Sequence, residues 1–397
     1  MRKRIYHFGL KASIWAICML PLSGFASDAL TVNGFVAQGI QRATQTNFVN
    51  DDGDTTLEMT ELGINARYQL SEQLSVNGQL VYLNAGQRYP EGIRIDYMFI
   101  DWHAIATAKW NLNVHLGRYK NYHWLYSATR DVPHTRPGNV LPQSIYFDSF
   151  RDVALGSDGI ALRANTANQW GDWEINWSYG RSPIGKDSTH QLFGDLATGD
   201  IDQEYAHQAS IYWRSFNSNW LLGGNLLDSD FTYHSGPNDF YGNGVANVQR
   251  VSLVAQWQSQ YWELTSEIMR ESSQYKDVVF PGFFSDSIAE GGYLQLTVMP
   301  KERIMGLVRV DLYDLNREDR NGNVLTAQSN GVLPNYFAYA DSATIGLRYD
   351  IMENLAVNAE YSRARGAGRL TPLLAKNSSA AKAEYWDFWS VQLMYWF

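Results

Sequence analysis

Histidine and hydroxyl side chains could do catalytic chemistry in this chain, but their spacing forms no active-site pattern. No HExxH, GxSxG, phosphate-binding P-loop or GxGxxG motif occurs in a suitable context. The triplet Ser188-Thr189-His190 has the residue types of a hydrolase, yet such a triplet in a polar loop is ordinary. Enzyme activity is therefore the least favoured function. The other histidines beyond the N-terminal segment are scattered, at His103, His115, His123, His134, His207 and His234.

Charged side chains gather between residues 118 and 152. The formal charge there is 5 − 3 = +2, in a chain whose net charge is −9. A ring of charge around a narrow passage selects ions, whereas arginines that only neutralise nearby carboxylates do not. The sequence leaves both interpretations open. The basic residues are Arg118, Lys120, Arg130, Arg136 and Arg151, and the acidic ones are Asp131, Asp148 and Asp152.

Two acidic stretches could hold a cation, but neither has the spacing of a calcium loop. Both lack the glycine at the sixth position and the distant glutamate of an EF-hand. We expect solvated loop charge, no metal site and no cofactor. The stretches contain Asp51, Asp52 and Asp54 in one loop and Asp319, Asn321 and Asn323 in another.

The N-terminal segment has the three parts of a secretory signal peptide. Basic residues between Arg2 and Lys11 precede an apolar run over 12–22, and small residues follow at Gly24 and Ala26. A short buried helix is the alternative interpretation. We expect cleavage after Ala26, so that residues 1–26 are removed and residues 27–397 form a single mature domain.

Removal of this segment changes the cysteine content and the charge. Cys18 is the only cysteine, so the mature chain would have no disulfide and no cysteine metal site. Four basic and no acidic residues are lost, and the net charge becomes 28 − 41 = −13. A strongly acidic chain is an unsuitable partner for nucleic acid.

Apolar and polar residues alternate along most of the mature chain, which predicts β-strands. In one segment Leu62, Ile64, Ala66, Tyr68 and Leu70 share a face opposite Glu61, Gly63, Asn65, Arg67 and Gln69. A soluble sandwich would bury the apolar face, whereas a membrane barrel would turn it to lipid. The barrel is favoured because the polar faces combine bulky charges with glycines and because aromatics cluster at strand ends.

The links between the predicted strands alternate in length, which also favours a barrel. Sixteen segments have strand patterns, from 30–44 to 384–397. Short links such as 217–219 follow even-numbered strands, and long links such as 182–204 follow odd-numbered ones. Outer-membrane barrels have short periplasmic turns and long extracellular loops. The sequence therefore predicts an all-β, transmembrane antiparallel β-barrel of 16 strands, although 14 or 18 also fit.

The end of the chain resembles the C-terminal assembly signal of Gram-negative outer-membrane barrels. Apolar residues alternate up to a terminal aromatic, at Trp389, Val391, Leu393, Tyr395 and Phe397. The mature chain as a whole looks like a member of the Gram-negative porin superfamily. The stretch from Thr129 to Tyr146 is similar to uncharacterised bacterial porin-like proteins, and this resemblance does not name a solute.

Residues 121–157 form the longest link, between the fifth and sixth predicted strands. In porins the loop at this place folds into the barrel and narrows the pore, which is what the resemblance implies here. Pro133, Pro137 and Pro142 stiffen the segment, and its aromatics disfavour disorder. A cap over the barrel mouth is the alternative.

Two sets of charged residues would then line the solute path. The constriction set is Lys120, Arg130, Asp131, His134, Arg136, Asp148, Arg151 and Asp152, and the lumen-wall set is Arg67, Arg94, Asp96, Arg163, Arg309 and Arg348. Arg118 shares parity with Leu116, so it would face lipid unless a bulge turns it or it lies at the headgroup rim. The sequence leaves its direction undecided.

The resulting hypothesis is an outer-membrane channel for small hydrophilic solutes, with a weak anion preference. A plugged structural or adhesive barrel is the main alternative. The expected partners are outer-membrane lipid, lipopolysaccharide, the barrel assembly machinery and small polar solutes. A homotrimer is what the family resemblance implies.

Overall fold

The computed structural model describes residues 29–51, 53–154, 156–194, 196–370 and 378–397. The predicted signal peptide, residues 1–26, lies outside the described residues. The described chain forms sixteen β-strands joined by turns, short helices and loops. No helix among these residues is long and apolar enough to cross a membrane.

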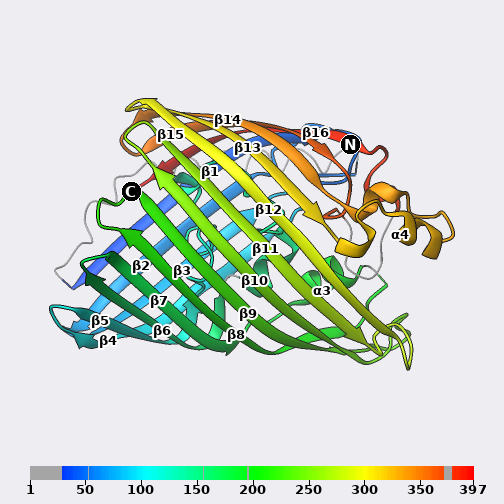
Figure 1. The fold of residues 1–397 in the computed structure, drawn as a ribbon, viewed down its shortest axis with the longest axis horizontal. Helices are drawn as coiled ribbons and strands as arrows, with labels where there is room; N and C mark the ends of the chain where they lie inside the picture. Colours follow the sequence, from blue (N-terminus) through cyan, green and yellow to red (C-terminus); the bar gives the residue numbers. More distant parts are fainter. Residues whose placement is uncertain (1–28, 52, 155, 195, 371–377) are drawn as a thin grey trace, which may run out of the picture.

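All sixteen strands belong to one closed antiparallel barrel, in which each strand pairs with its neighbours in the sequence and β1 pairs with β16. Figure 1 shows the first and last strands side by side on its wall. The prediction of sixteen strands is confirmed. The strands are β1 (Leu30–Ala43), β2 (Thr60–Ser71), β3 (Leu74–Asn84), β4 (Gly92–Ala106), β5 (Trp110–Lys120), β6 (Gly156–Asn168), β7 (Gly171–Arg181), β8 (Asp200–Ser215), β9 (Trp220–His234), β10 (Gly244–Gln258), β11 (Trp262–Lys276), β12 (Phe284–Lys301), β13 (Ile304–Asp314), β14 (Asp341–Met352), β15 (Leu355–Arg365) and β16 (Tyr385–Trp396).

Among the described residues, short helices lie only in the long loops. Figure 1 shows α4 at the end of the barrel opposite the short turns. The α-helices are α2 (Arg151–Ala154), α3 (Lys186–Phe193) and α4 (Asn323–Gln328), and the 3-10 turns are η1 (Pro133–Thr135), η2 (Asp148–Phe150), η3 (Arg317–Asp319), η4 (Asn335–Ala338) and η5 (Ser378–Ala380).

The two faces of the wall differ as the alternation predicts. On β13, Val308 and Val310 point outward and are 53% and 48% exposed, whereas Leu307 and Arg309, which alternate with them, point inward and are each 3% exposed. The outward face is apolar and the inward face is mixed with charge. This pattern places the apolar surface of the barrel on its outside, where lipid can cover it.

Strands β8 to β12 are longer than the sequence predicts. The predicted twelfth strand begins at residue 290, but β12 begins at Phe284. The extra residues, such as Asp286, Ser272 and Asp230, are polar although they lie on the outward face. Apolar and polar residues therefore stop alternating there, and only pairing with the neighbouring strands makes these residues strand.

Candidate functional site

The long link between β5 and β6 is the candidate functional site. We call its described residues, 121–154, the inner loop. It turns through η1, η2 and α2, with Pro133 at the start of η1. Among the described side chains of the inner loop, only Thr135 is exposed. The loop is therefore packed on nearly all sides.

Hydrogen bonds hold the inner loop against inward-facing residues of distant strands. The backbone N–H of Asn139 donates to Glu360 on β15 at 2.9 Å, and the Tyr146 hydroxyl donates to Glu267 on β11 at 2.6 Å. Arg309 on β13 donates to the Val140 carbonyl at 3.0 Å. These partners lie inside the barrel. The loop therefore folds inward, and it does not form an external cap.

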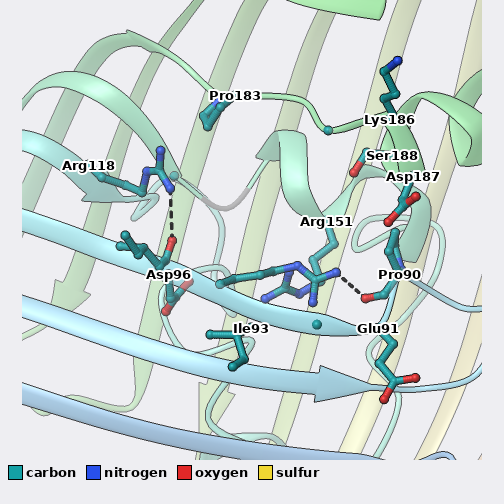
Figure 2. A pocket seen from close by; sticks show the side chains of 15 residues that line it. Pro90, Glu91, Ile93, Asp96, Arg118, Arg151, Pro183, Lys186, Asp187 and Ser188 are labelled. Atoms are coloured by element: carbon teal, nitrogen blue, oxygen red, sulfur yellow. Dashed lines mark hydrogen bonds between the residues drawn. The ribbon is translucent and has the colours of Figure 1, made fainter.

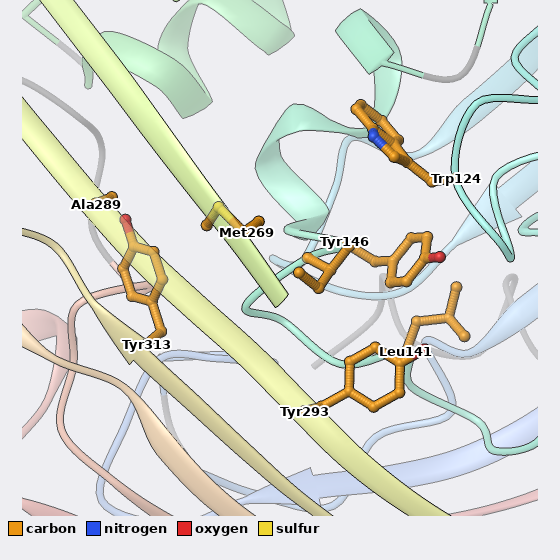
Figure 3. Close-up of a cluster of buried hydrophobic side chains, with 8 residues drawn as sticks. Trp124, Leu141, Tyr146, Met269, Ala289, Tyr293 and Tyr313 are labelled. Carbon is orange, nitrogen blue, oxygen red and sulfur yellow. The ribbon is translucent and has the colours of Figure 1, made fainter. Parts of the chain in front are cut away.

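An apolar cluster anchors the same loop to the wall. Four loop residues contact inward side chains from β11, β12 and β13, as Figure 3 shows for most of them. Burial of these rings and aliphatic groups stabilises the loop because it removes apolar surface from water. The cluster contains Trp124, Leu141, Ile145 and Tyr146 from the loop and Met269, Ala289, Tyr293 and Tyr313 from the wall.

The predicted constriction charges are buried and paired. Arg130 donates to Asp148 at 2.8 Å, and Arg151 pairs with Asp131. Lys120, at the end of β5, lies 2.5 Å from Asp96 on β4. The four loop residues among these are at most 6% exposed. The net positive charge predicted for residues 118–152 is thus balanced by carboxylates that lie next to the basic groups.

The structure brings most of the constriction set together, and some of these residues have partners outside the inner loop. Arg136 pairs with Glu61 of β2 at 2.6 Å, and Asp148 also accepts from Arg88 at 2.8 Å. The side chain of Asp152 is outside the described part of the structure. Each arginine of the set is therefore held by a carboxylate.

These pairs control the protonation of the buried acids. Burial disfavours the charged form of Asp148, but Arg88 and Arg130 outweigh it and hold its pKa below its ordinary value. Burial likewise opposes ionisation of Asp131, but Arg151 and Lys120 outweigh it and hold the pKa of Asp131 below its ordinary value. Both carboxylates are ionised at neutral pH.

His134 and His123 are neutral packing residues in the loop. The His134 ring stacks on Trp396 of β16 at 4.5 Å, and burial lowers its pKa to about 4. The two ring nitrogens of His123 lie 2.8 Å from Ser178 and 3.1 Å from Ser210, and burial lowers its pKa to about 3.

The predicted lumen-wall residues fall into two groups. Arg309 and Asp96 are buried beneath the inner loop, and Arg94 donates to the Pro90 carbonyl near the long-loop end. Arg67, Arg163 and Arg348 lie nearer the short-turn end and are exposed or half-buried. The second group faces the open part of the lumen.

A cavity of about 260 Å³ lies on this open side of the loop. Its lining includes Arg67, Asp101 and Arg163, with Tyr122 of the loop beside them. The guanidinium of Arg163 stacks 3.7 Å from the centre of the Tyr122 ring. The cavity therefore offers both signs of charge to a polar solute.

Arg118 points outward, at a place where the wall divides. The pairing of β4 with β5 ends at the pair Met98 and Arg118. The rest of β4, back to its start at Gly92, does not pair with β5. The Arg118 guanidinium crosses this gap: it donates to Asp158 on β6 at 2.7 and 2.9 Å and to the Ile95 carbonyl at 3.4 Å. Figure 2 shows Arg118 beside the cavity of about 530 Å³ at this gap.

The predicted assembly residues lie on the outward face of β16. Val391 and Phe397 are each 37% exposed, whereas Gln392 and Met394 between them are buried. Backbone groups of Phe397 and Gly34 exchange two hydrogen bonds of 3.0 Å. The terminal residue therefore joins the last strand to the first. Trp389, Leu393 and Tyr395 are half-buried on the same face.

Sequence reasoning missed two arginines of other loops that reach the site. Arg88 pairs with Asp148, and Arg369 donates to the Ser144 carbonyl at 3.3 Å. The Arg369 guanidinium also stacks on Tyr313 at 3.7 Å. No local pattern marks these residues, because closure of the barrel brings them to the inner loop.

Comparison with known proteins gives structural matches but no match in sequence. No family model matches the chain, and no curated protein is similar to it in sequence. Solved structures match over nearly the whole chain. The chain has the porin fold.

Three solved porin-like barrels illustrate the match. An anion-selective porin from Comamonas acidovorans has a TM-score of 0.58 at 12% identity, and the match covers 93% of this chain and 99% of that one. The outer membrane channel DcaP of Acinetobacter baumannii gives 0.56 at 11% identity, covering 93% and 97%. The trimer form of OmpT from Vibrio cholerae gives 0.54 at 11% identity, covering 93% and 99%. Such a porin-like barrel is an outer-membrane architecture.

Proposed function

We propose that this porin-like barrel is a passive diffusion channel for small hydrophilic solutes or ions. The observation that carries the proposal is the inner loop, which is held by Glu61, Glu360 and other inward residues within a closed barrel. An apolar exterior suits lipid, and a polar lumen narrowed by an internal segment suits selective diffusion.

We propose a weak anion preference that the wall arginines carry. Arg67, Arg163 and Arg348 lie near open lumen. Arg163 and Arg348 are paired with Glu174 and Asp350, but these pairs are partly exposed, whereas the ion pairs of the inner loop are buried. Only charges within about 10 Å of an ion path act individually at 0.1 M salt. The anion-selective porin with a similar fold supports the direction of this preference. In this proposal the constriction set keeps the loop in place and narrows the lumen.

A plugged barrel is the second candidate function. The burial of the inner loop favours it, since the loop contacts inward residues of β2, β7, β11, β13 and β15. Such a barrel would act through its external loops instead of its lumen.

We also propose that the chain assembles as a homotrimer, surrounded by outer-membrane lipid and lipopolysaccharide and inserted by the barrel assembly machinery. The trimer form of OmpT supports the oligomer. The outward alternation of β16 supports recognition by the assembly machinery.

Single-channel recording in planar bilayers tests these alternatives. A diffusion channel gives stepwise currents that rise with KCl concentration, and an anion preference gives the corresponding reversal potential in a KCl gradient. A folded, inserted barrel that passes no current would overturn the channel and support the plug.

A further inference from the structure

The seventh long loop, between β13 and β14, forms a polar cavity at the long-loop end of the barrel. Its volume is about 370 Å³, within the range of small-molecule sites. Every residue that lines it can form hydrogen bonds. These residues are Asp314, Arg320, Asn321, Asn323, Asn335, Tyr339, Asp341 and Arg365.

The cavity is built on a well-anchored loop. Asp319 accepts the backbone N–H groups of Val324 at 3.0 Å and Leu325 at 2.8 Å, which caps α4. Gly322 has a φ of +70°, and a Cβ there would lie 2.1 Å from the Asn335 carbonyl oxygen. A glycine therefore lets the start of α4 approach Asn335. This arrangement brings the cavity residues together before any ligand binds.

Three amides of the cavity are uncommitted. Within the described part of the chain, the side chains of Asn321, Asn323 and Asn335 make no hydrogen bond, and all three are exposed. Each amide presents both a donor and an acceptor. Their convergence favours a ligand that also carries donors and acceptors in pairs.

The charges and ring contacts argue against other ligand classes. Arg320 is paired with Asp314 and Glu290, and Arg365 is paired with Glu384, so neither guanidinium of the cavity is free to hold an anion. Among the described residues no group of His, Cys, Asp and Glu is placed to hold a metal. The guanidinium of Arg365 already covers the Tyr339 ring at 4.8 Å, which leaves less room for an aromatic ligand.

We propose that this cavity binds a neutral saccharide. Neighbouring hydroxyls of a sugar match the paired donors and acceptors of planar amide, carboxylate and guanidinium groups. Asp314 and Arg365 continue the outward faces of β13 and β15, so the site lies on the outer rim and outside the lumen. The site is independent of whether the barrel conducts.

Saturation-transfer NMR on the purified full barrel, in a detergent without a sugar headgroup, tests the proposal. The probes are neutral monosaccharides and disaccharides, and dextran as a polymeric source of the same chemistry. We expect saturable binding, which the double variant Asn321→Ala and Asn335→Ala weakens about tenfold. Because both residues are exposed, the variant should keep the heat-modifiable mobility of a folded barrel.

The matched control is Gln328→Ala, on the exposed part of α4 and outside the cavity lining. It should bind like the parent. Tighter binding of dextran than of free sugars would identify a polysaccharide as the source, and the reverse would identify a free sugar. No saturable binding of any neutral sugar, equal binding by the double variant, or preference for an amino acid would each overturn the proposal.

Discussion

The carboxylate of Glu61 and the guanidinium of Arg136 lie 2.6 Å apart, although 75 residues separate them in the sequence. Glu61 also accepts a hydrogen bond from Gln392 of β16 at 2.9 Å. One buried carboxylate therefore links β2, β16 and the inner loop close to the seam where the barrel closes. This link is one of several contacts that hold the inner loop in the lumen.

Glu61→Gln should release the inner loop. It leaves the Arg136 guanidinium buried without a counter-charge, and breaking such a pair costs about 3–5 kcal/mol. We expect a lower urea midpoint, together with a larger and noisier single-channel current. The control is Arg363→Gln, which removes an exposed pair with Asp387 and should leave the urea midpoint near that of the parent. Parent-like current and stability in Glu61→Gln would contradict this role.

Acid should loosen the inner loop as well. Asp148 has a pKa below its ordinary value, so its ion pairs stabilise the folded loop above about pH 4 and lose that effect as the pH falls further. Limited proteolysis should therefore cut the loop faster at low pH. Asp148→Asn should show the same susceptibility at neutral pH. Equal cleavage of the parent at acidic and neutral pH would refute the prediction.

Ion preference should depend on the wall arginines. The double variant Arg67→Ala and Arg163→Ala removes two positive charges that line the 260 Å³ cavity. Its reversal potential in a KCl gradient should move toward cation preference. Arg270→Ala is the control, because Arg270 lies on the outer face and its side chain is 60% exposed. An identical shift in both variants would show that the preference does not arise in the lumen.

Substitutions on the lipid face should be costly. Leu347→Arg and Val308→Arg place a charge on outward positions that are 56% and 53% exposed, and each should lower stability by roughly 2–4 kcal/mol near the membrane centre. Urea titration of the barrel in vesicles measures this. Thr344, on the inward face of the same strand as Leu347, is an unsuitable control because its side chain is buried and its hydroxyl lies 2.7 Å from the Ser362 hydroxyl. Asn65→Arg, on the partly exposed inward face, should have a much smaller effect, and an equal cost would mean a different lipid face.

Loss of the terminal aromatic should stop assembly. Deleting Phe397, or replacing it by Asp, removes the ring that lies against Gly34 and the end of an alternating outward face. We expect normal export but little folded barrel in the outer membrane, measured by fractionation and heat-modifiable mobility. Tyr385→Phe, which keeps an aromatic ring at an exposed outward position of β16, is the control. Normal levels of folded Phe397→Asp would disprove the role of this residue.

Alternation and link length predicted the architecture because they are local properties. Leu62 to Leu70 repeat every second residue, and a period of two specifies a strand with one apolar face whatever its partners are. Where the period fades, as at Asp286 and Ser272, the predicted strands are too short. Alternating short and long links reverse the chain at each end of the barrel, so consecutive strands run antiparallel and pair in sequence order.

The partners of the inner loop could not be predicted in the same way. The sequence places Arg130, Arg136 and Arg151 in one charged segment without showing their partners. Asp148 and Asp131 pair with Arg130 and Arg151 inside the folded loop, whereas Glu61 of β2 meets Arg136 only when the segment enters the closed barrel. Arg118 was undecided because its direction depends on a gap between β4 and β5, which is a property of strand pairing. Local patterns therefore determined the strands and their lipid face, whereas barrel closure, which joins residues far apart in the chain, decided which charges face water and which are buried in pairs.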